Sequence, residues 1–160
     1  MISVGEGAAH LYVWDHAVQV QLLRIMSPSG MPTKRPETEK ADAYLFVLAL
    51  RSVRRAAELV ADLTTGLQRD AIEQALSEFD AAFPTAKDIR DVLDRFDDYA
   101  LGHGKLQDEI RAFSTNEWYE RGTTTYRLSV GVDGKVLSVE ITAAARASQA
   151  LRHAVVEALS

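Results

Sequence analysis

Hydrophobic residues recur every three or four positions along most of the chain, which predicts a protein built mainly from helices. Four of these patterns predict helices over residues 7–26, 37–63, 67–83 and 143–159. The second helix is apolar nearly all round at "AYLFVLAL", so it is expected at the centre of a bundle. Segment 27–36 holds three prolines and a glycine, and it is predicted to be a mobile surface loop.

The same spacing predicts which side chains face the core. On the first helix the expected inner stripe is Leu11, Trp14, Val18, Leu22 and Ile25. On the second helix it is Leu45, Leu48, Val53, Ala56, Val60 and Leu63. A further helix is expected from a capping box at Thr85 and Asp88 to the glycines Gly102 and Gly104.

The pattern changes to strict alternation in "TTTYRLSVGVDGKVLSVEIT", residues 123–142, which predicts a β-hairpin. Its turn is expected at Asp133-Gly134, where both positions tolerate positive φ. This turn pairs Leu128 with Val139 and, further along, Tyr126 with Ile141. The predicted fold class is therefore mainly α, a four-to-five-helix bundle with one β-hairpin inserted before the C-terminal helix.

Composition narrows the class of protein. The chain of 160 residues suits one helical-bundle domain over residues 1–160. Its formal net charge of -5 opposes tight non-specific binding to phosphate backbones, although a local basic patch would still bind an anion. Without cysteine there is no disulfide or thiolate metal site. No segment has the length of a membrane span and no signal peptide is evident, so we expect a cytoplasmic protein that does not enter a membrane.

No metal or cofactor site is predicted. His10 and His16 lie six residues apart on the first helix, whereas histidine pairs that bind metal on a helix are one turn apart. "GVDG" is a hairpin turn and not a phosphate-binding loop. The basic cluster "RSVRRAAE" could extend a phosphate-binding face, but Arg51 and Arg55 are favoured as a solvated edge closed by Glu58.

The stretch "KDIRDVLDRFDDYALGHGK", residues 87–105, has the densest charge pattern. On a helix, Arg90 with Asp94 and Asp91 with Arg95 are pairs spaced by four residues. Such pairs contribute only about 0.2–0.5 kcal/mol each on a solvated surface. Residue types alone therefore favour a salt-bridged helix surface over a site.

The same stretch also resembles HEPN-type domains, the nucleotide-binding helical bundles of higher eukaryotes and prokaryotes. Their motif is an arginine, a polar residue, further residues and then a histidine. Arg90 and Asp91 match its start, Arg95 stands where the histidine is expected, and Phe96-Asp97-Asp98-Tyr99 is also similar. The resemblance covers roughly residues 42–104.

Members of this family are often metal-independent ribonucleases and commonly dimeric. The resemblance implies Arg90, Asp91 and Arg95 as the catalytic positions and Arg90, Arg95 and Tyr99 as ligand-binding residues. Arginine is a poor general base because its pKa lies above ~12. His103 is the candidate substitute base.

Three functions therefore remain open. The favoured one is a degenerate HEPN-like module, acting as a homodimer, that binds RNA, a nucleotide or a protein partner without cleaving it. The second is an active metal-independent endoribonuclease that uses His103. The third is a purely structural or assembly protein, which would agree with the acidic balance.

Overall fold

The computed structural model describes residues 2–26, 36–95, 98, 103–105, 116–121, 126–132 and 135–160. Within these residues the element order is α1 (Val4–Met26), α2 (Pro36–Leu63), α3 (Gly66–Ala82), α4 (Ala86–Asp94), β1 (Asn116–Arg121), β2 (Tyr126–Val132), β3 (Lys135–Glu140) and α6 (Ile141–Leu159). The mainly α prediction is confirmed. Residues 27–35 of the predicted loop and the turn at 133–134 lie outside the described residues. Residue 36, the last of the predicted loop, begins α2.

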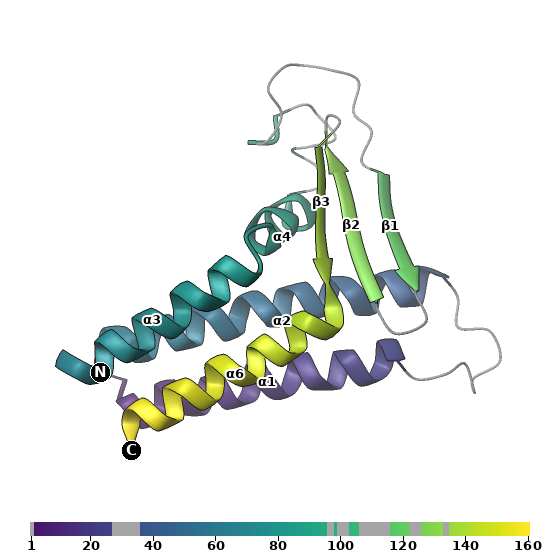
Figure 1. Cartoon of the computed structure of the whole chain (residues 1–160). Coiled ribbons are helices and arrows are strands. Elements are labelled where there is room, and N and C mark those ends of the chain that lie inside the picture. Colours follow the sequence, from purple (N-terminus) through teal and green to yellow (C-terminus); the bar gives the residue numbers. More distant parts are fainter. Residues whose placement is uncertain are drawn as a thin grey trace.

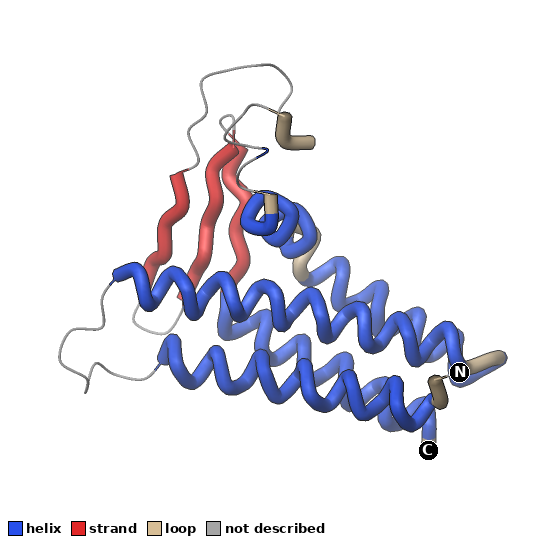
Figure 2. The backbone as a smooth tube through the Cα atoms, turned by 180° about the vertical axis from the view of Figure 1, so that it is seen from behind, coloured by secondary structure: helices blue, strands red, loops and turns tan. Residues whose placement is uncertain are grey.

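The long helices form a bundle, and the strands stand across one end of it (Figure 1). α2 packs against α1, α3, α4 and α6, so it occupies the central position predicted for it. α4 lies beside β3 and against α2, and the two chain termini lie together at the opposite end of the bundle (Figure 2). In the described part of the chain, no helix is long and apolar enough to cross a membrane.

α1 begins three residues earlier than predicted because the sequence "SVGE" forms a capping box. The backbone N–H of Ser3 donates to a carboxylate oxygen of Glu6 at 2.7 Å, and the N–H of Glu6 donates to Oγ of Ser3 at 3.2 Å. The bond from the Ser3 N–H, with a further one from the Ser3 hydroxyl to the same carboxylate oxygen, lowers the pKa of Glu6. The signal was present in the sequence and could have set the helix start.

The core-facing stripe of α2 differs from the predicted one. Leu45 and Leu48 are exposed, whereas Phe46 and Leu50 are completely buried. Trp14, predicted inside on α1, is 39% exposed. These assignments were wrong because an apolar helix has several apolar faces, and its neighbours decide which of them is covered.

A buried carboxylate links α1 to α6. Asp15 is 5% exposed and accepts hydrogen bonds from Oγ of Ser148 at 2.6 Å and from Nε of Arg152 at 2.8 Å. The guanidinium of Arg152 also lies over the ring of Tyr12, 5.1 Å from its centroid. A buried charge is tolerated only when it is paired in this way, so this network fixes how α1 and α6 align.

The predicted hairpin belongs to an antiparallel three-stranded sheet of order β1-β2-β3. Its register is confirmed, since Leu128 pairs with Val139 and Val132 pairs with Lys135, which leaves a two-residue connection. The predicted pairing of Tyr126 with Ile141 is wrong because Ile141 begins α6, whose N-terminal N–H groups donate to the Glu140 carboxylate. β1 was not predicted.

α4 differs from its prediction at both ends. Thr85 does not cap the helix, because its hydroxyl donates instead to the carbonyl of Ser138 on β3 at 2.7 Å. The helix ends at Asp94, and Arg95 has the non-helical angles φ -123 and ψ 37. The predicted capping box and the predicted continuation of the helix through Arg95 are therefore both wrong.

Candidate functional site

Both ion pairs predicted on α4 are present. Nη1 of Arg90 donates to Asp94 at 2.9 Å, and Nε of Arg95 lies 3.7 Å from a carboxylate oxygen of Asp91. Asp91 is also 3.9 Å from Nη2 of Arg90, so it lies between the two arginines. The charged face of α4 is thus the salt-bridge surface that the residue spacing indicated, and Arg90 already has a counter-ion.

The other predicted site residues are more scattered. Arg95 lies one residue past the end of α4 with its side chain 48% exposed. His103 is exposed, and its backbone N–H donates to the carbonyl of Asp98 at 2.8 Å. Within the described residues, no hydrogen bond or ion pair joins His103 to Arg90 or Arg95. Tyr99 lies outside the described residues.

The basic cluster on α2 does not form the single solvated edge that was favoured. Arg55 is exposed, but Arg51 is partly buried. Arg51 lies near Arg90 of α4, close enough for the charge of Arg90 to act on it. The fold therefore brings together two arginines that are 39 positions apart in the chain (51 to 90).

Arg51 is held in an unfavourable environment. Its pKa is lowered by partial burial and further by the positive charges of Arg54 and Arg90, against the weaker opposing effect of Glu58 and Asp80. Its Nε is buried and has no hydrogen-bond partner in the described structure, and the same holds for Nε of Arg90. We find no ion pair to Arg51 among the residues described. Arginine nevertheless stays protonated, so Arg51 carries a positive charge that no described carboxylate contacts as an ion pair.

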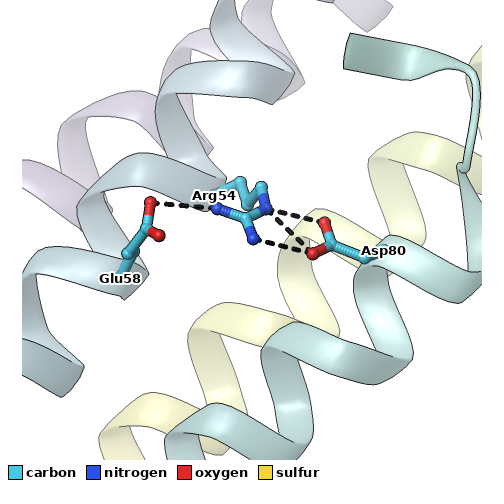
Figure 3. A network of polar contacts seen from close by, with 3 residues as sticks. All are labelled: Arg54, Glu58 and Asp80. Atoms are coloured by element: carbon cyan, nitrogen blue, oxygen red, sulfur yellow. Dashed lines mark hydrogen bonds and ion pairs between the residues drawn. The ribbon is translucent and has the colours of Figure 1, made fainter.

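Arg54 contrasts with Arg51 on the same helix. Its Nε donates to Asp80 of α3 at 2.7 Å, its Nη2 donates to the other oxygen at 2.8 Å, and its Nη1 donates to Glu58 at 2.9 Å (Figure 3). The bidentate bonds to Asp80 raise the pKa of Arg54 despite its partial burial. Arg54 is therefore neutralised and joins α2 to α3, which leaves Arg51 as the available cation of this pair.

A groove of about 420 Å³ opens beside these arginines, between α2, the end of α3 and the start of α4. Its basic lining comes from Arg51, Arg54 and Lys87, and Arg90 lies close to Arg51. Leu50 and Phe79 contribute a buried apolar wall. The arrangement is suited to an anion that also has an apolar part.

The sequence contained a signal for this groove. Arg51, Arg54 and Glu58 are spaced by three and four residues, so they share one helix face, and Arg55 lies at the solvent-exposed edge of that face. Which face meets α3 and α4 is a tertiary property. No group of histidines and carboxylates able to hold a metal occurs in the part of the chain that the structure describes.

Comparison with known proteins identifies no similar protein. No protein-family model, curated protein or solved structure matches the chain. The geometry of the groove is therefore the basis for assigning a function.

Proposed function

We propose that this chain is a degenerate HEPN-like module that binds a phosphate-bearing ligand without cleaving it. The proposal rests on a single observation: Arg51 is partly buried, repelled by two neighbouring arginines, and has no counter-ion among the described residues. A cation held in this way destabilises the empty protein. A bound anion would supply the missing hydrogen bonds and relieve the repulsion.

Phosphate is the anion that best fits this arrangement. A guanidinium offers donors in a planar fork that matches two phosphate oxygens. Lys87, at the start of α4 on the same groove, adds a second exposed cation. Arg90 would then act mainly through its charge, because its Nη1 is engaged by Asp94. The ligand-binding role that the motif assigned to Arg90, Arg95 and Tyr99 thus shifts to Arg51 with Arg90.

The absence of cleavage is inferred from Arg95. It occupies the position where the family has a histidine, and a guanidinium does not accept a proton near neutral pH. Its neighbour Asp91 lies between Arg90 and Arg95 as their shared counter-ion. Losing a general base typically reduces the rate ~10²- to 10⁴-fold, so the module is expected to bind and not to turn over.

The first experiment measures anion binding. Thermal unfolding is followed with increasing inorganic phosphate or RNA, and a ligand specific to the folded state raises the Tm. Arg51→Gln is expected to abolish this rise. Arg55→Gln is the matched control, because it removes the same charge from an exposed position on the same helix. A rise that is equal in all three proteins would overturn the proposal.

A second experiment tests for catalysis. The protein is incubated with mixed RNA in EDTA, and no cleavage above the buffer control is expected. Robust cleavage that is lost in Arg90→Ala would instead establish the ribonuclease alternative, and the effect of His103→Ala would then show whether that histidine is the base. Sedimentation equilibrium of the same preparation tests the homodimer that the resemblance implies.

A further inference from the structure

The groove has one positively charged end and one end where the positive charge is neutralised, and this difference limits which ligands can bind. At the α4 end, Arg51 and Lys87 form no ion pair with any described residue. At the α3 end, Arg54 is enclosed by the carboxylates of Glu58 and Asp80. An anion is therefore favoured at one end only.

The first turn of α4 strengthens the positive end. A helix N-terminus attracts anions through its free N–H groups and its dipole. The Thr85 hydroxyl would ordinarily cap such groups, but it is bonded to the carbonyl of Ser138. Ala86 and Lys87, the first two residues of the helix, line the groove; the N–H of Ala86 already donates to the carbonyl of Phe83 at 3.2 Å, so the attraction comes from the helix dipole and the Lys87 side chain, against the Asp88 carboxylate in the same turn. The unpaired guanidinium of Arg51 is a separate observation that points to the same anion.

An aromatic wall follows the positive end. Phe83 is partly buried and meets Phe79 edge-to-face, with ring centroids 5.8 Å apart. Pro84 next to it is exposed and also lines the groove. A flat ring system can lie on this wall, since stacking on aromatic side chains stabilises bound bases.

A long RNA strand fits this groove poorly. Its successive phosphates would pass Glu58 and Asp80 at one end and approach Asp91 and Asp94 near the other. The chain as a whole carries a net charge of -5, which opposes a polyanion. The volume of about 420 Å³ is that of a small-molecule site.

From these observations we infer that the ligand is a nucleoside monophosphate, with its phosphate between Arg51 and Lys87 and its base against Phe83. This inference rests on the proposed anion-binding function and narrows it to a mononucleotide. Glu58 and Asp80 at the other end of the groove would repel the next phosphate of a polynucleotide strand. The aromatic wall selects a ligand with a planar ring over inorganic phosphate.

The test compares four probes by isothermal titration calorimetry: AMP, adenosine, inorganic phosphate and an oligoadenylate that lacks a terminal phosphate. AMP is expected to bind about tenfold more tightly than phosphate, the effect of stacking one base. Adenosine alone should bind most weakly because it lacks the charge. Phe83→Leu should reduce AMP affinity to that of phosphate and leave phosphate affinity unchanged. Trp14→Leu, on α1 and away from the groove, is the aromatic control.

The outcomes separate the two proposals. If no probe binds, the proposed function itself fails. If phosphate binds in an Arg51-dependent way but AMP binds no better, the mononucleotide inference fails and anion binding stands. If oligoadenylate binds more tightly than AMP with a steep salt dependence, the ligand is a polynucleotide and the inference is wrong. The ratio of AMP to phosphate affinity in the unmodified protein decides the matter even if Phe83→Leu does not fold.

Discussion

Replacing Arg51 by methionine is expected to stabilise the empty protein. The guanidinium is desolvated, close to Arg54 and Arg90, and its buried Nε has no partner among the described residues. Methionine keeps an unbranched apolar stem that can occupy the same space and has a similar helix propensity. The substitution therefore removes an unfavourable charge and little favourable packing.

The expected gain is about 1 kcal/mol. An unsatisfied buried donor destabilises a protein by roughly 1–3 kcal/mol, and the low end applies because water can reach the exposed part of the guanidinium. For a chain of 160 residues this corresponds to a rise in Tm of roughly 2–4 °C. The like-charge repulsion that is also removed acts in the same direction.

Thermal unfolding in a phosphate-free buffer measures this change. Arg55→Met serves as the control, because Arg55 is exposed and surface substitutions usually change stability by less than about 0.5 kcal/mol. A loss of 1 kcal/mol or more in Arg51→Met, with no loss in the control, would refute the reasoning. Arg51 would then be a structural residue, and the observation behind the proposed function would be removed.

Three further substitutions test the fold. Asp15→Ala leaves the partly buried Arg152 without its carboxylate, so the free energy of unfolding measured in urea should fall by roughly 3 kcal/mol. A fall of less than about 1 kcal/mol would contradict a buried ion pair. Ser3→Ala removes the hydroxyl bond to the Glu6 carboxylate but keeps the backbone N–H bond, which is the larger cause of the lowered pKa of Glu6; its effect on Tm should therefore be small, should be largest above the ordinary pKa of 4.5, and should fade as pH drops through the lowered value. Gly66→Ala should destabilise by roughly 1 kcal/mol because φ is 59°, and an unchanged Tm would mean that this backbone relaxes freely.

Local signals in the sequence were reliable where the determining contacts are also local. The alternation and the turn residues set the β2–β3 register, with Leu128 opposite Val139. The pairs on α4 followed from helix geometry, since Arg90 and Asp94 lie one turn apart. Predictions failed where a distant partner competed, as when Ser138 takes the hydroxyl of Thr85 from its expected cap.

The candidate site shows the same division. The sequence indicated Arg90 with Asp91 and Asp94, and these lie on one helix as expected, although the helix is shorter than predicted. It did not indicate that Arg51 would approach Arg90, because the two residues share no local pattern. Nor did it indicate the aromatic wall, because Phe83 lies in the connection between α3 and α4 and meets the groove only in the folded chain.

The sequence by itself determined that this chain forms a mainly helical bundle with a β-hairpin, because the repeat of apolar positions depends only on neighbouring residues. The tertiary structure decided which helix faces are buried, which partly buried arginine has no ion pair within the described part of the chain, and where the groove opens. Those properties depend on how elements distant in the chain pack. The charge of Arg51 acquires its chemical meaning only from the groups that surround it in space.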